Sequence, residues 1–196
     1  MNPAEGSWQP VPEELKDDSI LLAAVVDEHR QIYTKYFTDD LAVNHGLPVL
    51  THAFRRLDEW RVFLLLTPWM LARLFVPDND PGLRIPPDWY AQARISRDYL
   101  VIGPTFELPL LTGKQKAHLN HSAAIGHYLL HPLILSMTDF NNPEEAFTAW
   151  NRVIETRNRN MEKMQKRNPL QEEITRRELF SGLFNLETAV EREKDR

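Results

Sequence analysis

The chain has 196 residues, of which 42% are hydrophobic and 26% are charged, and its formal net charge is −5. Such values are typical of a globular protein with a genuine core, and the acidic balance argues against a general nucleic-acid binder, which usually carries a basic surplus. The chain contains no cysteine, which excludes disulfides, thiolate metal sites and cysteine nucleophiles.

The start of the chain predicts a flexible N-terminal arm. Residues 1–16 contain three prolines and Gly6 among mostly polar residues, a composition that disfavours regular structure. Trp8 either docks on the domain or moves with this arm. No basic region precedes an apolar stretch, so we predict no signal peptide, and the longest apolar runs, 20–26 and 62–66, are too short to span a bilayer. We therefore expect a cytoplasmic protein without membrane insertion.

The first predicted helix covers residues 19–38. Asp18-Ser19 offers a cap at its start, and Asn44-His45-Gly46 marks the loop that follows it. Between these points, apolar and aromatic side chains recur at three- and four-residue steps and form one stripe along a helix. The stripe consists of Leu22, Val25, Val26, His29, Ile32, Tyr33, Tyr36 and Phe37.

The next part of the chain predicts strands. Residues 49–56 form a plausible strand, residues 57–60 can turn the chain, and the apolar run 61–66 is typical of a central strand. Pro68 cannot donate to a sheet ladder, so we expect a bulge, an edge or a break at this position. Residues 70–76 continue apolar and end at a loop rich in proline and aspartate.

The region after this loop is less regular. We interpret residues 83–98 as a connection that contains a short helix over 88–94. Residues 99–108 resemble one strand that bends at Gly103-Pro104. Residues 118–130 predict one long strand rather than a helix, because the glycine and proline in and after this segment disfavour a helix.

The C-terminal part predicts helices. Asn142 is a good cap and Pro143 suits the first helical position, and the stripe of Phe147, Trp150 and Ile154 is expected to be buried. A final amphipathic stretch over 174–186 either docks on the core or binds a partner in a groove, and residues 187–196 form a charged tail. Together these elements predict a single α+β domain over residues 17–186, in which an antiparallel sheet packs with an N-terminal helix and C-terminal helices.

Histidines are the only residues whose grouping suggests metal binding. His118, His121, His127 and His131 lie close together in the sequence, and imidazole binds zinc, nickel and iron. On the predicted strand, however, His118 and His121 point to opposite faces, which favours ordinary surface or packing histidines and no metal site. Enzyme motifs are also missing: the sequence has no Gly-x-Ser-x-Gly and no glycine-rich phosphate loop, so we expect no enzyme.

Several segments, in order, are similar to those of one known family. They are Leu47-Pro48-Val49 with Phe54 and Trp60, Thr67-Pro68-Trp69-Met70-Leu71 with the loop 77–82, Gly103-Pro104-Thr105-Phe106-Glu107, residues 128–137, and Arg176-Arg177-Glu178-Leu179-Phe180-Ser181-Gly182. Through them the chain resembles the HybE/HupJ family of [NiFe]-hydrogenase assembly chaperones, in patches over about residues 30–183. Members of the family often carry cysteines in these strands, and some are joined to a rubredoxin domain, whereas this chain has no cysteine and therefore no Cys-x-x-Cys pair.

The resemblance implies a non-enzymatic maturation factor without a cofactor. Its partners would be a hydrogenase subunit or precursor and other maturation proteins, and not nucleic acid. The residues expected to bind the partner are Thr67, Pro68, Trp69, Met70, Arg176, Arg177 and Phe180. Trp69 has two interpretations: an exposed aromatic that anchors the partner, or a core side chain. The alternative function is metal binding or delivery through the four histidines.

Overall fold

The structure is a computed structural model that describes residues 8–95, 97–110 and 113–163. The chain divides into two compact units, residues 1–147 and 148–196. In chain order, the elements of the first unit are η1 (Glu13–Leu15), α1 (Asp18–Tyr36), β1 (Leu50–Leu57), β2 (Trp60–Thr67), β3 (Met70–Pro77), η2 (Pro87–Trp89), α2 (Ala91–Arg94), β4 (Thr105–Leu110), β5 (Gly113–Ser122) and β6 (Gly126–Ile134).

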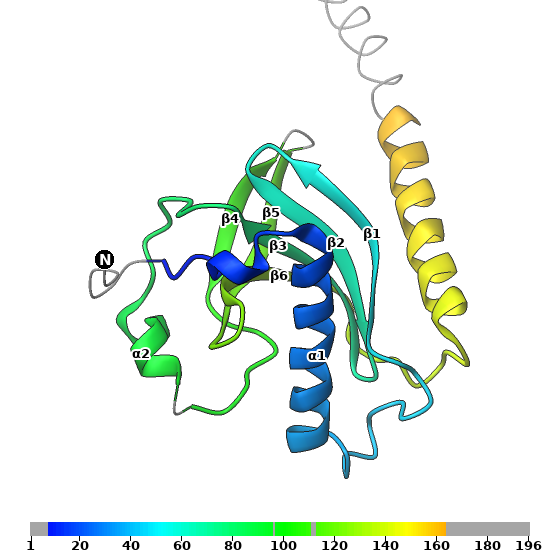
Figure 1. Cartoon of the computed structure of the whole chain (residues 1–196). Coiled ribbons are helices and arrows are strands. Elements are labelled where there is room, and N and C mark those ends of the chain that lie inside the picture. The colour runs from blue at the N-terminus through cyan, green and yellow to red at the C-terminus, as the bar shows by residue number, and fades with distance from the viewer. Residues whose placement is uncertain (1–7, 96, 111–112, 164–196) are drawn as a thin grey trace, which may run out of the picture. The chain divides into compact units, whose positions relative to one another are not determined.

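The strands form one six-stranded sheet in the order β1-β2-β3-β6-β5-β4 (Figure 1). Every neighbouring pair is antiparallel. The pairing of β3 with β6 joins the meander β1-β2-β3 to the meander β4-β5-β6, so the most central strands come from segments far apart in the sequence. The prediction of an α+β fold with an antiparallel sheet is confirmed.

The central strands β2 and β3 are covered on both faces. Seven of the eight residues of β2 are buried, with Phe63 and Leu65 in the core that includes α1, and Val62 in a second core that includes Trp8 and Trp89. A strand with two buried faces is apolar along its whole length, which explains the continuous apolar run. Edge strand β1 instead exposes several residues and carries an irregularity between His52 and Arg55.

Helix α1 lies along one face of the sheet (Figure 1). The predicted helix is confirmed, but its cap is Asp17 rather than Asp18-Ser19, because the Asp17 carboxylate accepts from the backbone N–H groups of Ser19 and Ile20 at 2.9 and 3.2 Å. The face of the helix that packs on the sheet buries Leu21, Val25, His29 and Ile32 completely or nearly so.

Two strand predictions were wrong. Residues 99–104 are not a strand, and β4 begins only at Thr105. The apolar side chains of Tyr99 and Val101 pack against the core that includes α1 without strand pairing. The predicted single strand 118–130 is a hairpin, with β5 and β6 on either side of a turn that ends at Gly126. Gly126 has a φ of +87°, a conformation that other residues adopt only under strain.

The expected break at Pro68 is a tight hairpin turn. Thr67 pairs with Met70 across β2 and β3, so Pro68 and Trp69 are the two turn residues. The irregular region after β3 contains η2 and α2, which agrees with the short helix predicted there.

The described part of the N-terminal arm packs against the sheet. Trp8 and Val11 are only 2% and 7% exposed, and they belong to the cores on opposite faces of the sheet. Of the two alternatives for Trp8, the structure shows the docked one. The segment therefore crosses from one face to the other at an end of β6, where Gln9 accepts the backbone N–H of His127 at 2.9 Å.

A C-terminal helix runs over residues 143–163. Asn142 caps it, as predicted, by accepting the backbone N–H of Glu145 at 3.0 Å. The expected stripe of Phe147, Trp150 and Ile154 is half-buried rather than buried. The predicted amphipathic stretch 174–186 and the charged tail 187–196 lie outside the described residues.

Candidate functional site

The segment Thr67–Met70 lies in the core. All four side chains are buried, with Thr67 and Met70 at 0% exposure. The Thr67 hydroxyl accepts the backbone N–H of Met70 at 3.0 Å and donates to its carbonyl at 3.1 Å, which locks the turn. The carbonyl of Pro68 accepts the backbone N–H of Asn44 at 3.0 Å, so the loop after α1 covers the turn.

The Trp69 ring fills the space between this turn and the end of α1. It stacks on Phe37, with ring centroids 4.4 Å apart, and lies nearly parallel to Tyr33. Trp69 is only 6% exposed. The structure therefore shows the core interpretation of Trp69, and the expected exposed aromatic and proline surface over residues 67–70 is not present because the loop after α1 and α1 itself cover it.

The remaining predicted partner-binding residues, Arg176, Arg177 and Phe180, lie outside the described residues. Partner binding through them stays a prediction.

A buried cluster of polar aromatic rings adjoins Trp69. His29 on α1 is fully buried; its Nδ1–H donates to the carbonyl of Val25 at 2.8 Å. Its Nε2 and the hydroxyl of Tyr128 have no hydrogen-bond partner within the described part of the chain. Burial lowers the pKa of His29 to about 4 and raises the pKa values of both tyrosines. All three side chains are therefore neutral at pH 7.

The four clustered histidines do not converge on one point. His118 donates through Nδ1 to the carbonyl of Gly103 at 3.0 Å, and His131 lies opposite Arg73 on β3. His121 and His127 face each other across β5 and β6 with ring centroids 4.7 Å apart. Among the described residues, no group of three His, Asp or Glu side chains has the arrangement of a metal site.

His121 and His127 instead hold the N-terminal segment. His127 accepts the backbone N–H of Gln9 at Nδ1, at 2.7 Å, and donates through Nε2 to the carbonyl of Trp89 at 2.9 Å. His121 donates through Nε2 to the Gln9 side-chain oxygen at 2.8 Å. Burial is the main cause that lowers the pKa of His121 to about 4 and also lowers the pKa of His127. These two histidines serve as neutral hydrogen-bonding groups.

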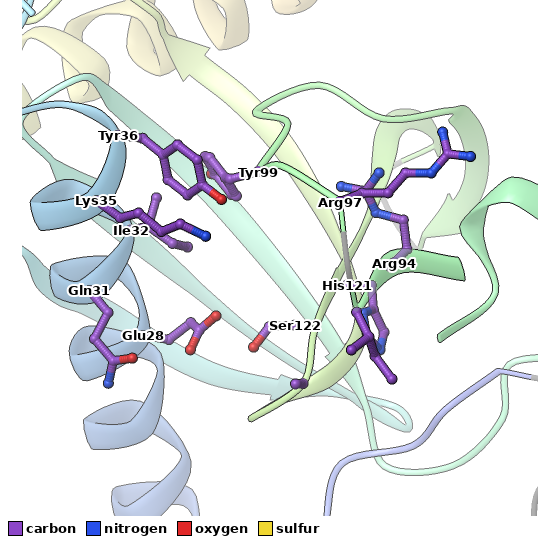
Figure 2. Close-up of a pocket in the computed structure, with 12 residues that line it drawn as sticks. Glu28, Gln31, Ile32, Lys35, Tyr36, Arg94, Arg97, Tyr99, His121 and Ser122 are labelled. Atoms are coloured by element: carbon purple, nitrogen blue, oxygen red, sulfur yellow. The ribbon is translucent and has the colours of Figure 1, made fainter. Parts of the chain in front are cut away.

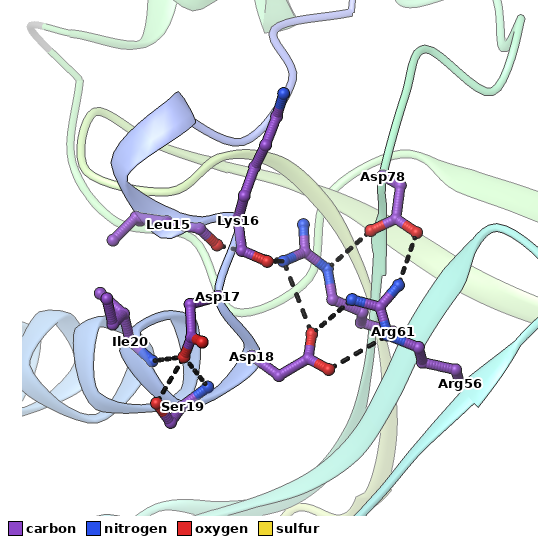
Figure 3. A network of polar contacts seen from close by, with 9 residues as sticks. All are labelled: Leu15, Lys16, Asp17, Asp18, Ser19, Ile20, Arg56, Arg61 and Asp78. Carbon is purple, nitrogen blue, oxygen red and sulfur yellow. Dashed lines mark hydrogen bonds and ion pairs between the residues drawn. The ribbon is translucent and has the colours of Figure 1, made fainter.

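A charged cluster at one end of β2 is paired internally (Figure 3). The Arg61 side chain is 1% exposed and lies 3.0 Å from the Asp78 carboxylate, while Arg56 bridges Asp78 and Asp18 at 3.0 and 2.7 Å. Arg61 also donates to the carbonyl of Leu15 at 3.1 Å. The cluster ties η1 and α1 to the sheet, which is a structural role.

An open cleft lies between α1 and the segment that contains α2 (Figure 2). It has a volume of 220 Å³, and its lining consists of Glu28, Gln31, Ile32, Lys35, Tyr36, Arg94, Ile95, Arg97, Tyr99, His121, Ser122 and Ala123. Figure 2 shows Glu28 and Lys35 pointing from α1 into the space that faces Arg94 and His121. Tyr99 joins the cleft to the buried aromatic cluster.

Sequence reasoning did not single out Lys35, Arg94 or Arg97, because these residues come from separate segments that only the fold brings together. One feature of the sequence could have pointed to the cleft: several apolar residues lie in and just after the segment 83–98, which was interpreted as a connection. Within it, Ile95, Leu100 and Ile102 are 72%, 47% and 48% exposed.

Comparisons with known proteins give one family. Residues 21–182 match the model of a family described as "[NiFe]-hydrogenase assembly, chaperone, HybE". The solution structure of HybE from Escherichia coli is similar over 60% of this chain and 65% of its own length, slightly less than two thirds, with 18% sequence identity and a TM-score of 0.41. The comparison with curated proteins gives no match. No helix among the described residues is both long and apolar enough to cross a membrane.

Proposed function

Because the chain belongs to the HybE family of [NiFe]-hydrogenase assembly chaperones, we propose that it binds a hydrogenase subunit or its precursor during maturation and catalyses no reaction itself. The family model supports this proposal, since it spans residues 21–182 and therefore covers the whole sheet, all but the first three residues of α1, and the cleft. We further propose that the protein acts in the cytoplasm, where a subunit is held before export, and that other maturation proteins join the complex.

The alternative of histidine-based metal delivery has weaker support. His127 uses both ring nitrogens to bind Gln9 and Trp89, and His121 uses its Nε2 to bind Gln9. A histidine must offer a free, neutral ring nitrogen to bind a metal. Metal binding by His127 would require one of its contacts to break. Holding a client protein requires no such change.

Co-purification tests the proposed function. The full chain, tagged at its C-terminus, is expressed in cells that make a [NiFe]-hydrogenase, and proteins that co-purify are identified by mass spectrometry. We expect a hydrogenase subunit or its precursor in stoichiometric amounts. The control uses the same cells without the hydrogenase structural genes. The captured hydrogenase subunit should be missing from that sample. Capture of no hydrogenase subunit or maturation protein would contradict the proposal.

A second measurement follows the consequence for the enzyme. Deletion of the gene for this chain should reduce hydrogenase activity and leave unprocessed subunit, and a plasmid copy should restore both. Normal activity and processing in the deletion strain would contradict a role in maturation.

A further inference from the structure

The cleft beside α1 carries a charge opposite in sign to that of the chain. Lys35, Arg94 and Arg97 contribute three positive charges to its lining and Glu28 contributes one negative charge, whereas the whole chain has a formal net charge of −5. A concave surface of one sign concentrates groups of the other sign. The cleft therefore favours an anionic group over a cationic one.

The cations of the cleft have donors left for a ligand. Arg94 uses one nitrogen to donate to the carbonyl of Asp98 at 2.7 Å, and its guanidinium lies 4.4 Å from the centre of the Trp89 ring. Its Nε is buried and so is not open to the cleft, which leaves the other terminal nitrogen of the guanidinium for a ligand. Arg97 is exposed, and its side chain makes no hydrogen bond or ion pair with the described part of the chain.

A planar guanidinium that is held in place and keeps free donors suits a carboxylate. Lys35 adds a cation from the opposite wall, where its amine lies 4.7 Å from the centre of the Tyr36 ring. Burial and the neighbouring charge of Arg97 lower the pKa of Arg94, and the carboxylates of Asp88 and Asp98 act in the opposite direction. Neither carboxylate lines the cleft. Glu28 is the one carboxylate among the residues that line the cleft, so the three cations there outnumber the protein's own carboxylates.

Apolar side chains surround these cations. Ile32 and Tyr36 line the cleft, and Ile95 at its edge is 72% exposed. Leu100 and Ile102, which follow in the same segment, are about half exposed. Exposed apolar residues that adjoin a hollow are typical of a surface that binds another protein.

The volume of the cleft favours side chains of a peptide over an enclosed small molecule or cofactor. Its volume of 220 Å³ is below the roughly 300–1,000 Å³ of sites that enclose small molecules or cofactors. An open cleft of this size accommodates one or two side chains of a longer chain, while the rest of that chain lies on the apolar rim.

We propose that this cleft is the site where the client binds, and that it takes an extended peptide segment of the client in which an acidic side chain is flanked by apolar ones. The acidic group pairs with Lys35, Arg94 and Arg97, and the apolar neighbours pack on Ile95 and Tyr36. This inference depends on the proposed function, because it names the surface through which the chain would hold a hydrogenase subunit.

Charge reversal on both walls tests the location. The variant combines Lys35→Glu and Arg97→Glu, two exposed residues whose replacement leaves the core intact. The matched control combines Arg30→Glu on the same helix and Arg84→Glu in a loop, which are exposed and do not line the cleft. In the co-purification experiment we expect the cleft variant to capture at least roughly tenfold less client, and the control to capture as much as the wild type.

The outcomes separate the two proposals. If the wild type captures a client and the cleft variant captures it equally well, the cleft is not the site and the chaperone function stands. If the wild type captures no client, the proposed function itself fails. Circular dichroism of both variants checks that they fold.

Binding of peptides tests the chemistry. Overlapping peptides of the captured subunit are labelled, and their binding to the full chain is measured by fluorescence polarisation. We expect the strongest peptide to carry an Asp or Glu beside apolar residues, to lose affinity when that acid becomes Asn or Gln, and to bind more weakly as salt rises. Glu28→Gln should tighten this peptide by roughly two- to fivefold, because a repelling charge is removed.

Two results would overturn the assignment of the ligand. One is that the best peptide is basic and that Glu28→Gln weakens it. The other is that no peptide binds, while vesicles containing an anionic lipid sediment with the wild type and not with the cleft variant; the cleft would then bind a membrane surface. Tightening by Glu28→Gln is an effect that a purely structural role of this residue would not produce.

Discussion

Phe37 and Trp69 stack face to face, with ring centroids 4.4 Å apart and planes inclined by 16°. Phe37 follows the last residue of α1, and Trp69 stands in the turn between β2 and β3. The contact therefore joins the helix to the sheet at the segment that most resembles the family. The segment Thr67–Leu71 supports the architecture on which any binding surface depends.

We expect Trp69→Ala to lower the free energy of unfolding by about 3–5 kcal/mol, because it leaves a cavity beside Phe37 and Tyr33. Trp69→Phe keeps a ring in the core and should cost less. Urea unfolding followed by circular dichroism measures both. If Trp69 is a core residue, the folded Phe variant should capture the client as the wild type does. A Phe variant that is as stable as the wild type but captures none would restore Trp69 as a contact residue.

The buried His29 should make the protein sensitive to acid. Its pKa in the folded state is about 4, whereas the ordinary pKa of histidine is 6.5, so below pH 6.5 the unfolded chain binds a proton that the folded chain does not accept. Stability from this group is therefore complete above pH 6.5 and is lost as the pH falls toward 4. The full effect is about 3 kcal/mol.

His29→Phe should remove that component of the pH dependence. Urea unfolding of both proteins between pH 4 and 7 gives the difference in free energy, in which the contribution of the carboxylates cancels. We expect the variant to lose less stability than the wild type over this range. Parallel curves for the two proteins would show that His29 is protonated equally in both states.

The ion pair between Arg61 and Asp78 should matter far more than a surface pair. Asp78→Asn leaves the cation of a side chain that is 1% exposed without its nearest carboxylate, and we expect a loss of about 2 kcal/mol. Asp27→Asn removes the exposed pair with Arg30 and should have little effect. Chemical denaturation compares the two.

Adding Arg61→Met to Asp78→Asn should recover part of the lost stability, because the unpaired buried cation is removed. If the double variant is less stable than Asp78→Asn alone, the contacts of Arg61 with the carbonyl groups near η1 dominate instead.

Hydrophobic periodicity predicted the elements whose burial follows a regular pattern along the chain. α1 packs one stripe on the sheet and β2 is buried on both faces, and both patterns are visible in the sequence. The hairpin of β5 and β6 was missed because its polar residues, among them His127 and Asn120, are buried by contacts with distant segments. Local alternation cannot reveal such partners.

The cleft could not be predicted for the same reason. Glu28, Arg94 and His121 belong to three segments that only the fold places around one space. The segment Thr67–Met70 shows the reverse case. Its residue types suit either a core or a binding surface, and only the loop after α1, which covers the turn, decides between them.

Gly126 should control how the N-terminal segment docks. A Cβ atom at this position would lie 2.6 Å from the carbonyl oxygen of Gln9 and 2.7 Å from that of Pro10, and its φ is +87°. Gly126→Ala therefore combines backbone strain with a clash against the docked backbone. We expect it to cost about 2–3 kcal/mol and to displace the segment that carries Trp8.

Gly82 provides the matched control, because its φ is also positive, at +69°, but a Cβ there would meet nothing within 4 Å. Gly82→Ala should cost only the strain, about 1 kcal/mol. Hydrogen exchange of the Gln9 amide, which donates to His127, separates the two effects: it should become fast in Gly126→Ala and stay protected in Gly82→Ala. Protection that persists in both variants would mean that the segment shifts with the turn and keeps its contacts.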